Sequence, residues 1–130
     1  MKVLADSNIF IDFWKKPDQA LIETFSNEDI VTCGVVKAEL MHGAKSDADL
    51  NRICELLDEF ETLDFESSDW KDLGNDLYAL RTNGVTVPFQ DAVIALLAIK
   101  NKIPLWTRDT HFSYIQRVLK ALELYEAETN

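Results

Sequence analysis

The chain begins with the stretch MKVLADSNIFIDFW, residues 1–14, and this stretch decides the fold. Its apolar run ends in a carboxylate at Asp6, and the next segment carries apolar residues at helical spacing, Ile9, Phe10, Phe13 and Trp14. The pattern predicts a strand, an acid at the carboxyl end of that strand, and a helix. Ligands bind at the carboxyl ends of the strands in open α/β sheets, so we expect Asp6 to face a site.

The rest of the chain repeats this alternation of short apolar runs and amphipathic segments. Further strands are expected at residues 29–32, 62–65 and 103–107, with an edge strand at 122–125 and a frayed acidic tail behind it. Expected helices cover 19–25, 35–44, 91–100 and 113–120, together with a helix capped by Asp47 or Asp49 and one that starts at Ser67 or Ser68, turns Trp70 inward and ends at Asn83-Gly84.

Helices between short strands imply parallel pairing with right-handed crossovers. The predicted fold class is therefore α/β, a three-layer α/β/α sandwich around a central parallel sheet of about four to five short strands. A chain of 130 residues with 47% apolar content is long enough for one domain with its own core. No internal repeat or linker interrupts it, so residues 1–130 are expected to form a single domain.

Composition limits the classes of function. No charged-then-apolar leader is present at the N-terminus, and no apolar run approaches the ~18 residues of a membrane span, so a soluble, cytoplasmic protein is expected. The two cysteines, Cys33 and Cys54, lie in apolar segments without metal-ligand spacing and are expected to be reduced and buried. The net charge of −10 means that any nucleic-acid function must depend on metal ions and local basic groups.

Three later acids, Glu39, Asp91 and Asp109, lie at strand-to-helix junctions or helix starts similar to that of Asp6. Each alone has an ordinary explanation, as a helix cap or as solvated surface, and Asp12 is better explained in that way. Four acids at one edge of a sheet are different. Carboxylates about 5 Å apart repel by roughly 3 kcal/mol per pair at an effective dielectric constant near 20, so such a cluster must take up protons or bind a cation.

Oxygen ligands favour hard ions, and the expected cofactor is therefore Mg²⁺, with Mn²⁺ as a possible substitute. Ions bound there can lower the pKa of water and so produce a hydroxide for in-line attack on a phosphodiester. Ser7 and Asn8 can support the Asp6 carboxylate from behind. This is the chemistry of a nuclease that has no nucleophilic side chain.

Four segments of the chain resemble the signature motifs of PIN-domain ribonucleases. In order they are VLADSNIFID at 3–12, VKAELMHG at 36–43, DAVIA at 91–95 and LWTRDTHF at 105–112. The small size and the segment LRTNG at 80–84 are similar to VapC-type toxins of type II toxin-antitoxin systems. The resemblance spans nearly the whole chain, from Lys2 to about Phe112, and depends on the order and spacing of the four motifs together.

The resemblance implies an acidic quartet around Mg²⁺, formed by Asp6, Glu39, Asp91 and Asp109, with Asp6, Asp91 and Asp109 as the metal ligands. It implies supporting roles for Asn8 and Thr107. It also implies selective RNA cleavage, a homodimer, and inhibition by a small VapB-like antitoxin.

Several basic residues are available to bind the phosphates of a nucleic acid. Candidate phosphate contacts are Lys15, Lys16, Lys37, Lys45, Arg81 and Arg108. A Glu-x-x-His pair at Glu39 and His42 has the spacing of di-iron bundles, but the second pair that those need is missing. An aspartyl phosphotransfer site would require an acid two residues after Asp6, where Asn8 stands. The remaining alternative is a domain of the same fold that binds RNA or a protein without cleaving. His111 is interpreted as part of a helix start.

Overall fold

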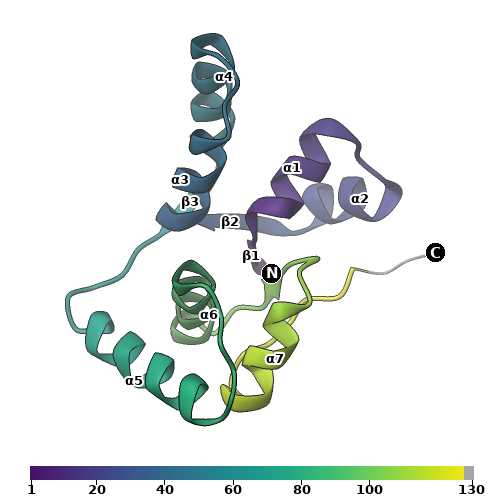
Figure 1. The fold of residues 1–130 in the computed structure, drawn as a ribbon. Coiled ribbons are helices and arrows are strands. Elements are labelled where there is room, and N and C mark those ends of the chain that lie inside the picture. The colour runs from purple at the N-terminus through teal and green to yellow at the C-terminus, as the bar shows by residue number, and fades with distance from the viewer. Residues whose placement is uncertain (128–130) are drawn as a thin grey trace.

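A computed structural model of the chain describes residues 1–127, and its centre is a four-stranded parallel sheet (Figure 1). The strands are β1 (Lys2–Ala5), β2 (Asp29–Cys33), β3 (Glu61–Leu63) and β4 (Leu105–Trp106), in the spatial order β3-β2-β1-β4. The predicted edge strand at 122–125 is reduced to one parallel bridge, between Leu105 and Leu124. The predicted parallel sheet of about four to five strands is therefore confirmed.

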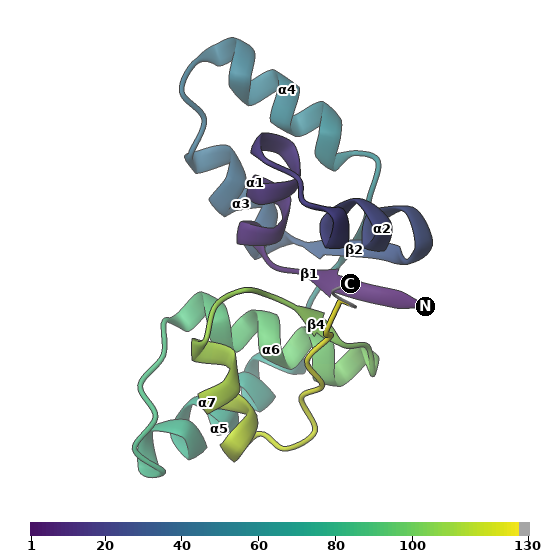
Figure 2. The ribbon, with the colours of Figure 1, turned by 90° about the vertical axis from the view of Figure 1, so that its right-hand side faces the viewer.

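Helices cover both faces of this sheet, as the predicted sandwich requires. On one face lie α1 (Ser7–Lys15), α2 (Gln19–Asn27), α3 (Gly34–His42) and α4 (Asp47–Leu57), and on the other lie α5 (Asp69–Thr82), α6 (Phe89–Asn101) and α7 (His111–Val118) (Figures 1 and 2). The division follows from the strand order. Successive strands from β1 to β3 are added toward one edge of the sheet, and the chain then crosses back to place β4 on the other side of β1. Because both kinds of crossover are right-handed, their helices lie on opposite faces of the sheet.

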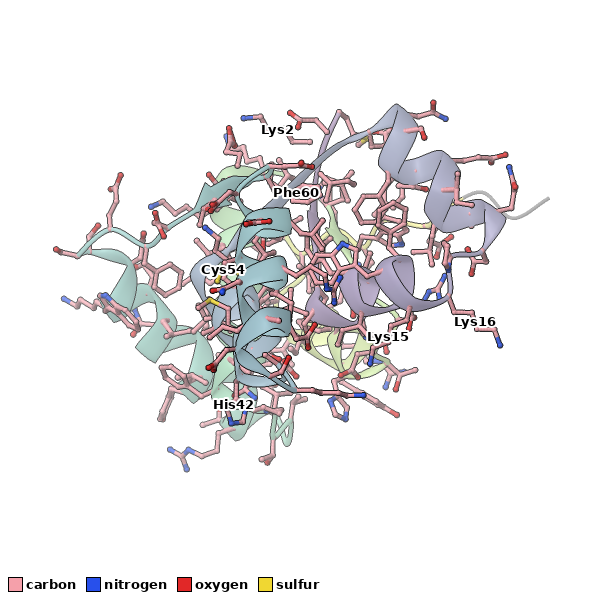
Figure 3. The ribbon with its side chains drawn as sticks, turned by 90° about the horizontal axis from the view of Figure 1, so that it is seen from above. Lys2, Lys15, Lys16, His42, Cys54 and Phe60 are labelled. Atoms are coloured by element: carbon pink, nitrogen blue, oxygen red, sulfur yellow. The ribbon has the colours of Figure 1, made fainter. Side chains whose placement is uncertain are left out.

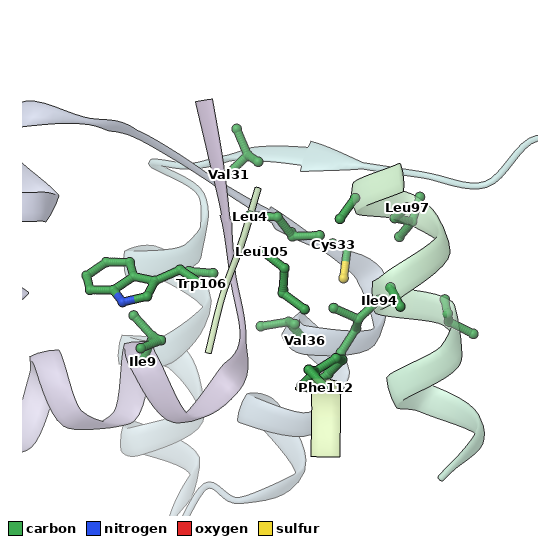
Figure 4. Packing of buried hydrophobic residues seen from close by; sticks show 14 of the residues in the cluster. Leu4, Ile9, Val31, Cys33, Val36, Ile94, Leu97, Leu105, Trp106 and Phe112 are labelled. Atoms are coloured by element: carbon green, nitrogen blue, oxygen red, sulfur yellow. The ribbon is translucent and has the colours of Figure 1, made fainter. Parts of the chain in front are cut away.

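The core forms on both faces because the central strands are apolar throughout and side chains alternate along a strand. Leu105 points toward α6, whereas the next residue, Trp106, points to the side of α1, where it lies near Ile9 (Figure 4). A cluster of aromatic side chains stabilises the α1 side of the sheet, where the ring of Phe10 packs edge-on against the rings of Phe25 and Phe60. β1 is thus held rigidly from both sides, and this fixes the position of the acid that follows it.

Several element ends differ from the sequence prediction, each for a local reason. Ser46 caps α4 in place of Asp47 or Asp49, because its hydroxyl accepts a hydrogen bond from the backbone N–H of Asp49 at 3.1 Å. Trp70 was expected to face inward but is 55% exposed, with its ring edge-on to Phe65. The stop at Gly84 is confirmed, since this residue has a φ of 78°, which favours glycine.

The ends of α6 and α7 matter more for function. α6 begins at Phe89, two residues before the expected start, so Asp91 lies inside its first turn. α7 begins at His111 instead of Ser113. The N-terminal residues of both helices therefore belong to the region that the acids occupy.

Two composition-based expectations can be compared with the structure. Cys33 is fully buried and Cys54 is partly buried, and both are free thiols. Within residues 1–127, no helix is both long enough and apolar enough to cross a membrane. The end of the predicted acidic tail, residues 128–130, lies outside the described residues.

Candidate metal centre and active site

Asp6 lies directly after β1, at the carboxyl edge of the sheet, and is only 6% exposed. The backbone N–H of Ser7 donates a hydrogen bond to its Oδ1 at 2.8 Å, and the hydroxyl of Thr107 donates to its Oδ2 at 2.9 Å. Burial raises the pKa of Asp6, the two hydrogen bonds oppose that shift, and the negative charge of Asp109 adds to it. Asp6 is thus fixed in direction at both oxygens.

Asp91 reaches the same region from the other layer, in the first turn of α6, and is 9% exposed. Its pKa is raised from 3.8 to about 6, first by burial and then by the charges of Asp6, Asp109 and Glu39. Repulsion from three separate acids requires that all of them lie near Asp91. The structure therefore brings together the four acids that the sequence singled out.

Glu39 comes from α3 and forms the solvent side of the cluster. The hydroxyl of Ser7 donates a hydrogen bond to its Oε2 at 3.3 Å. Burial and the charge of Asp6 both raise the pKa of Glu39. Since its side chain remains exposed, Glu39 is the acid of the four best placed to meet water and substrate.

Asp109 lies in the loop between β4 and α7, and the loop holds it through Thr107. The hydroxyl of Thr107 accepts a hydrogen bond from the backbone N–H of Asp109 at 3.0 Å while it donates to Asp6. The backbone N–H of His111 donates to Oδ1 of Asp109 at 2.9 Å. A single threonine hydroxyl thus connects two acids that are 103 residues apart in the sequence.

The expected support of Asp6 by Asn8 is not observed. Among residues 1–127 the side-chain oxygen of Asn8 is buried without a hydrogen-bond partner, and Ser7 and Thr107 make the contacts to Asp6 instead. The reason is geometric. Asp6 caps α1, so the N–H of the very next residue is the group that points at its carboxylate, and Asn8 already lies within the helix.

Comparison with known proteins identifies the family of the chain. The family model described as the PIN domain matches residues 3–118. The chain belongs to the PIN domain family. PIN domains are generally nucleases, so the chain falls in a family of hydrolases that act on nucleic acid. No curated protein sequence matches the chain significantly.

Solved structures share the fold at low sequence identity. A chain of VapBC2 from Rickettsia felis, bound to a promoter DNA fragment, has a TM-score of 0.82 and 21% identity over 98% of this PIN domain and 100% of that chain. A chain of VapBC-1 from nontypeable Haemophilus influenzae has a TM-score of 0.81 and 22% identity, over 97% and 98%. A chain of FitAcB from Neisseria gonorrhoeae has a TM-score of 0.77 and 19% identity, over 95% and 96%.

The donor set of this PIN domain fits a divalent cation. Four carboxylates share a partly buried region, and burial together with the charge of neighbouring acids raises the pKa of Asp6, Glu39 and Asp91. Carboxylate oxygens are the ligands of Mg²⁺ and Mn²⁺. Among the acids of the cluster, Asp91 and Asp109 offer ligand atoms close enough to share such an ion, and the charge of Asp6 acts on both Asp91 and the site.

The predicted phosphate contacts lie on different parts of the molecule. Lys15 and Lys45 line, with Glu39 and Arg52, a groove of about 340 Å³ between α1, α3 and α4. Lys15 and Lys16 lie at the end of α1, away from Lys2 (Figure 3). Lys37 is partly buried on α3, and Arg81 lies on α5 with its guanidinium over the ring of Tyr78.

Arg108 has a different role from the one expected. Its guanidinium pairs with Asp12 at 2.9 Å and with Asp18 at 2.7 Å, which ties the β4–α7 loop to α1 and to the residue that caps α2. Two carboxylates already satisfy this cation, so the prediction of a free phosphate contact at Arg108 does not fit the structure. The sequence did not reveal the pairing because the partners lie 90 and 96 residues away.

Two further residues at the site were missed from sequence. The imidazole of His111 lies 3.3 Å from Asp109 and 3.7 Å from Asp91, and Arg52 reaches the groove beside Glu39. The spacing Asp109-x-His111 at a helix start was the available signal for the histidine. Nothing in the sequence pattern around Arg52 distinguishes it from other surface arginines.

Proposed function

We propose that this PIN domain is an Mg²⁺-dependent endoribonuclease and the toxin of a type II toxin-antitoxin pair. The observation that carries the proposal is the convergence of Asp6, Glu39, Asp91 and Asp109 at one edge of the sheet, where burial and then repulsion between the acids raise the pKa of Asp91 to about 6. Burying several carboxylates close together destabilises a fold, and carboxylates with perturbed pKa values are concentrated at functional sites. A divalent cation would convert the repulsion into binding.

The residues divide the chemical work by their positions. A divalent ion in this site supplies positive charge that lowers the pKa of water and stabilises the charge that develops on a phosphodiester. Thr107 and the N–H of Ser7 orient the two oxygens of Asp6. Glu39 is exposed, and among the described residues the hydrogen bond from Ser7 reaches only Oε2, which leaves Oε1 available to accept a proton from the attacking water.

RNA binding by so acidic a chain is supported by the local distribution of charge. Although the chain carries a net charge of −10, three basic residues line the same groove as Glu39, namely Lys15, Lys45 and Arg52. Arg52 is paired with Asp49, whereas no ion pair to Lys15 or Lys45 is found within residues 1–127. We propose these two lysines as contacts to phosphates on either side of the cleaved bond.

The toxin assignment is supported by the shared fold, since the similar chains come from VapBC and FitAB-type complexes. A VapB-like antitoxin is the partner that we expect, and the cytoplasm is the expected place of action. A homodimer is supported by exposed aromatic side chains on the α5–α7 face, Tyr78, Phe89 and Tyr114, each about half exposed or more.

The test is RNA cleavage by purified protein with Mg²⁺, with Mn²⁺ and with a chelator. Asp6→Asn and Asp91→Asn should each lower the cleavage rate by more than about 100-fold, because each removes metal-binding charge. Asp64→Asn is the matched control, since Asp64 is exposed after β3 and lies outside the cluster. The wild-type chain should arrest growth when expressed, and Asp6→Asn or a co-expressed antitoxin from the neighbouring reading frame should relieve the arrest.

The main rival makes a different prediction in the same experiment. A domain that binds RNA without cleaving it would retain RNA in a binding assay and leave it intact with either metal ion. Cleavage that continues at the wild-type rate in Asp6→Asn would instead refute the assignment of the acids.

A further inference from the structure

His111 stands at the start of α7 and directs its side chain toward two of the acids. Its Nδ1 is 3.3 Å from Oδ1 of Asp109 and 3.7 Å from Oδ2 of Asp91. One potential ligand atom from each of these three residues can be chosen so that all lie within 4.8 Å of one another. The imidazole is 55% exposed, so water and ions have access to it.

These separations match the space that one metal ion needs. At ligand distances of about 2.0–2.2 Å, two ligands side by side in an octahedral shell are about 3 Å apart and two opposite ligands about 4.3 Å apart. The separation between His111 and Asp109 is close to the first value, and the 3.7 Å separation from Asp91 lies between the two. Small rotations of the side chains would place the three donors around one ion.

The backbone already orients these donors. The N–H of His111 holds Oδ1 of Asp109, and Thr107 holds the backbone of Asp109, so the two side chains leave the same turn in a fixed relation. Asp91 enters from the first turn of α6, which packs against α7. Such support of metal ligands by surrounding hydrogen bonds is typical of built sites.

We propose that His111 is a nitrogen ligand of the metal centre, together with Asp91 and Asp109, and that it makes the centre bind a transition-metal dication more tightly than the Mg²⁺ of the proposed function. The proposal rests on the proposed function only in requiring that the acid cluster holds a divalent ion. Imidazole is a ligand of transition-metal dications such as Zn²⁺ and Fe²⁺ and can also coordinate Mn²⁺, the weakest binder of that series, whereas Mg²⁺ strongly prefers oxygen. An all-carboxylate site would favour Mn²⁺ only modestly and would show no nitrogen coupling.

Manganese is the probe for the test because it reports its own ligands. The affinity of the full chain for Mn²⁺ is measured from the loss of the free-ion signal in electron paramagnetic resonance, and pulsed measurements detect coupling of the bound ion to ¹⁴N. Wild-type protein should bind Mn²⁺ more tightly than Mg²⁺ and show the nitrogen coupling. His111→Gln should lose the coupling and bind Mn²⁺ at least about 10-fold more weakly, with less than about a threefold change for Mg²⁺ measured by competition.

The chain offers a matched control and a reversal. His42 is the other histidine of the chain, exposed at the end of α3, so His42→Gln should retain both the coupling and the affinity. His111→Asp replaces nitrogen by oxygen and should shift the preference toward Mg²⁺. Melting curves of the variants in chelator confirm that each is folded.

The outcomes separate this inference from the proposed function. If wild-type protein binds Mn²⁺ without nitrogen coupling, or if His111→Gln leaves the affinity unchanged, His111 is not a ligand, and the acidic nuclease site can still stand. If wild-type protein binds neither ion, both proposals are wrong. If Mn²⁺ binds with nitrogen coupling but RNA remains intact, the metal site is correct and the nuclease assignment is not.

Discussion

Replacing Asp91 by asparagine should stabilise the metal-free protein while it removes activity. Asp91 is buried in the first turn of α6 beside three other acids, and its pKa is about 6 in the folded protein against 3.8 for an ordinary aspartate. Each pKa unit corresponds to 1.36 kcal/mol, so ionisation of Asp91 costs the fold at most about 3 kcal/mol at neutral pH. Loss of the favourable interaction between a carboxylate and the N-terminus of α6 offsets about 0.5–1 kcal/mol. We therefore expect a net gain of at most about 2–2.5 kcal/mol.

The pH dependence follows from the direction of the shift. Below about pH 4, Asp91 is protonated in both the folded and the unfolded chain, so its ionisation no longer makes the wild type less stable than Asp91→Asn. Between about pH 4 and 6 the folded state binds more protons than the unfolded state, and the stability of the wild type falls as the pH rises. The advantage of Asp91→Asn should therefore appear over this range and be complete near pH 7.

Urea unfolding in chelator at a series of pH values measures the difference. With a slope of about 1.5 kcal/mol/M, the midpoint of Asp91→Asn should lie higher than that of the wild type at pH 7.5, by up to about 1.5 M. Mg²⁺ at 100 times its dissociation constant raises the free energy of unfolding of a chain that binds it by about 2.7 kcal/mol. With Mg²⁺ present, the wild type should therefore become more stable than Asp91→Asn, which has lost a metal ligand. The control Asp64→Asn should follow the wild type throughout. Equal midpoints at pH 7.5 in chelator, or a less stable Asp91→Asn, would refute the carboxylate repulsion.

Three further predictions concern other groups. Thr107→Val should lower both Mg²⁺ affinity and RNA cleavage by about 10- to 100-fold, because it removes the hydroxyl that orients Asp6, and Thr107→Ser should restore most of the loss in a metal titration. Arg108→Ala should lower the free energy of unfolding by only about 1 kcal/mol, because the two ion pairs that it removes are exposed. It should leave the salt dependence of RNA binding unchanged, and a shallower salt dependence would show that Arg108 contacts phosphate after all. A thiol reagent at pH 8 should label only Cys54 in the native protein and Cys33 as well in denaturant, because burial raises the pKa of the Cys33 thiol to about 11; two labelled thiols in the native state would contradict this.

The acids could be recognised before the structure because their positions follow from local rules. Asp6 ends an apolar run and Asp91 opens an apolar helix, and parallel strands place their carboxyl ends at one edge. The supporting contacts could not be recognised in this way. The choice of Ser7 over Asn8 depends on the turn of the chain at the start of α1, and the double ion pair of Arg108 joins segments at least 90 residues apart.

The sequence by itself determined the layers, the parallel sheet and the identity of the four acids, because hydrophobic periodicity and the order of strands and helices are written along the chain. Only the tertiary structure decided what surrounds those acids. Burial by the core and the approach of separate loops set the raised pKa of Asp91, the hydrogen bonds of Thr107 to two acids, and the place of His111 between Asp91 and Asp109. These properties depend on distances between residues remote in sequence, and no local pattern encodes such distances.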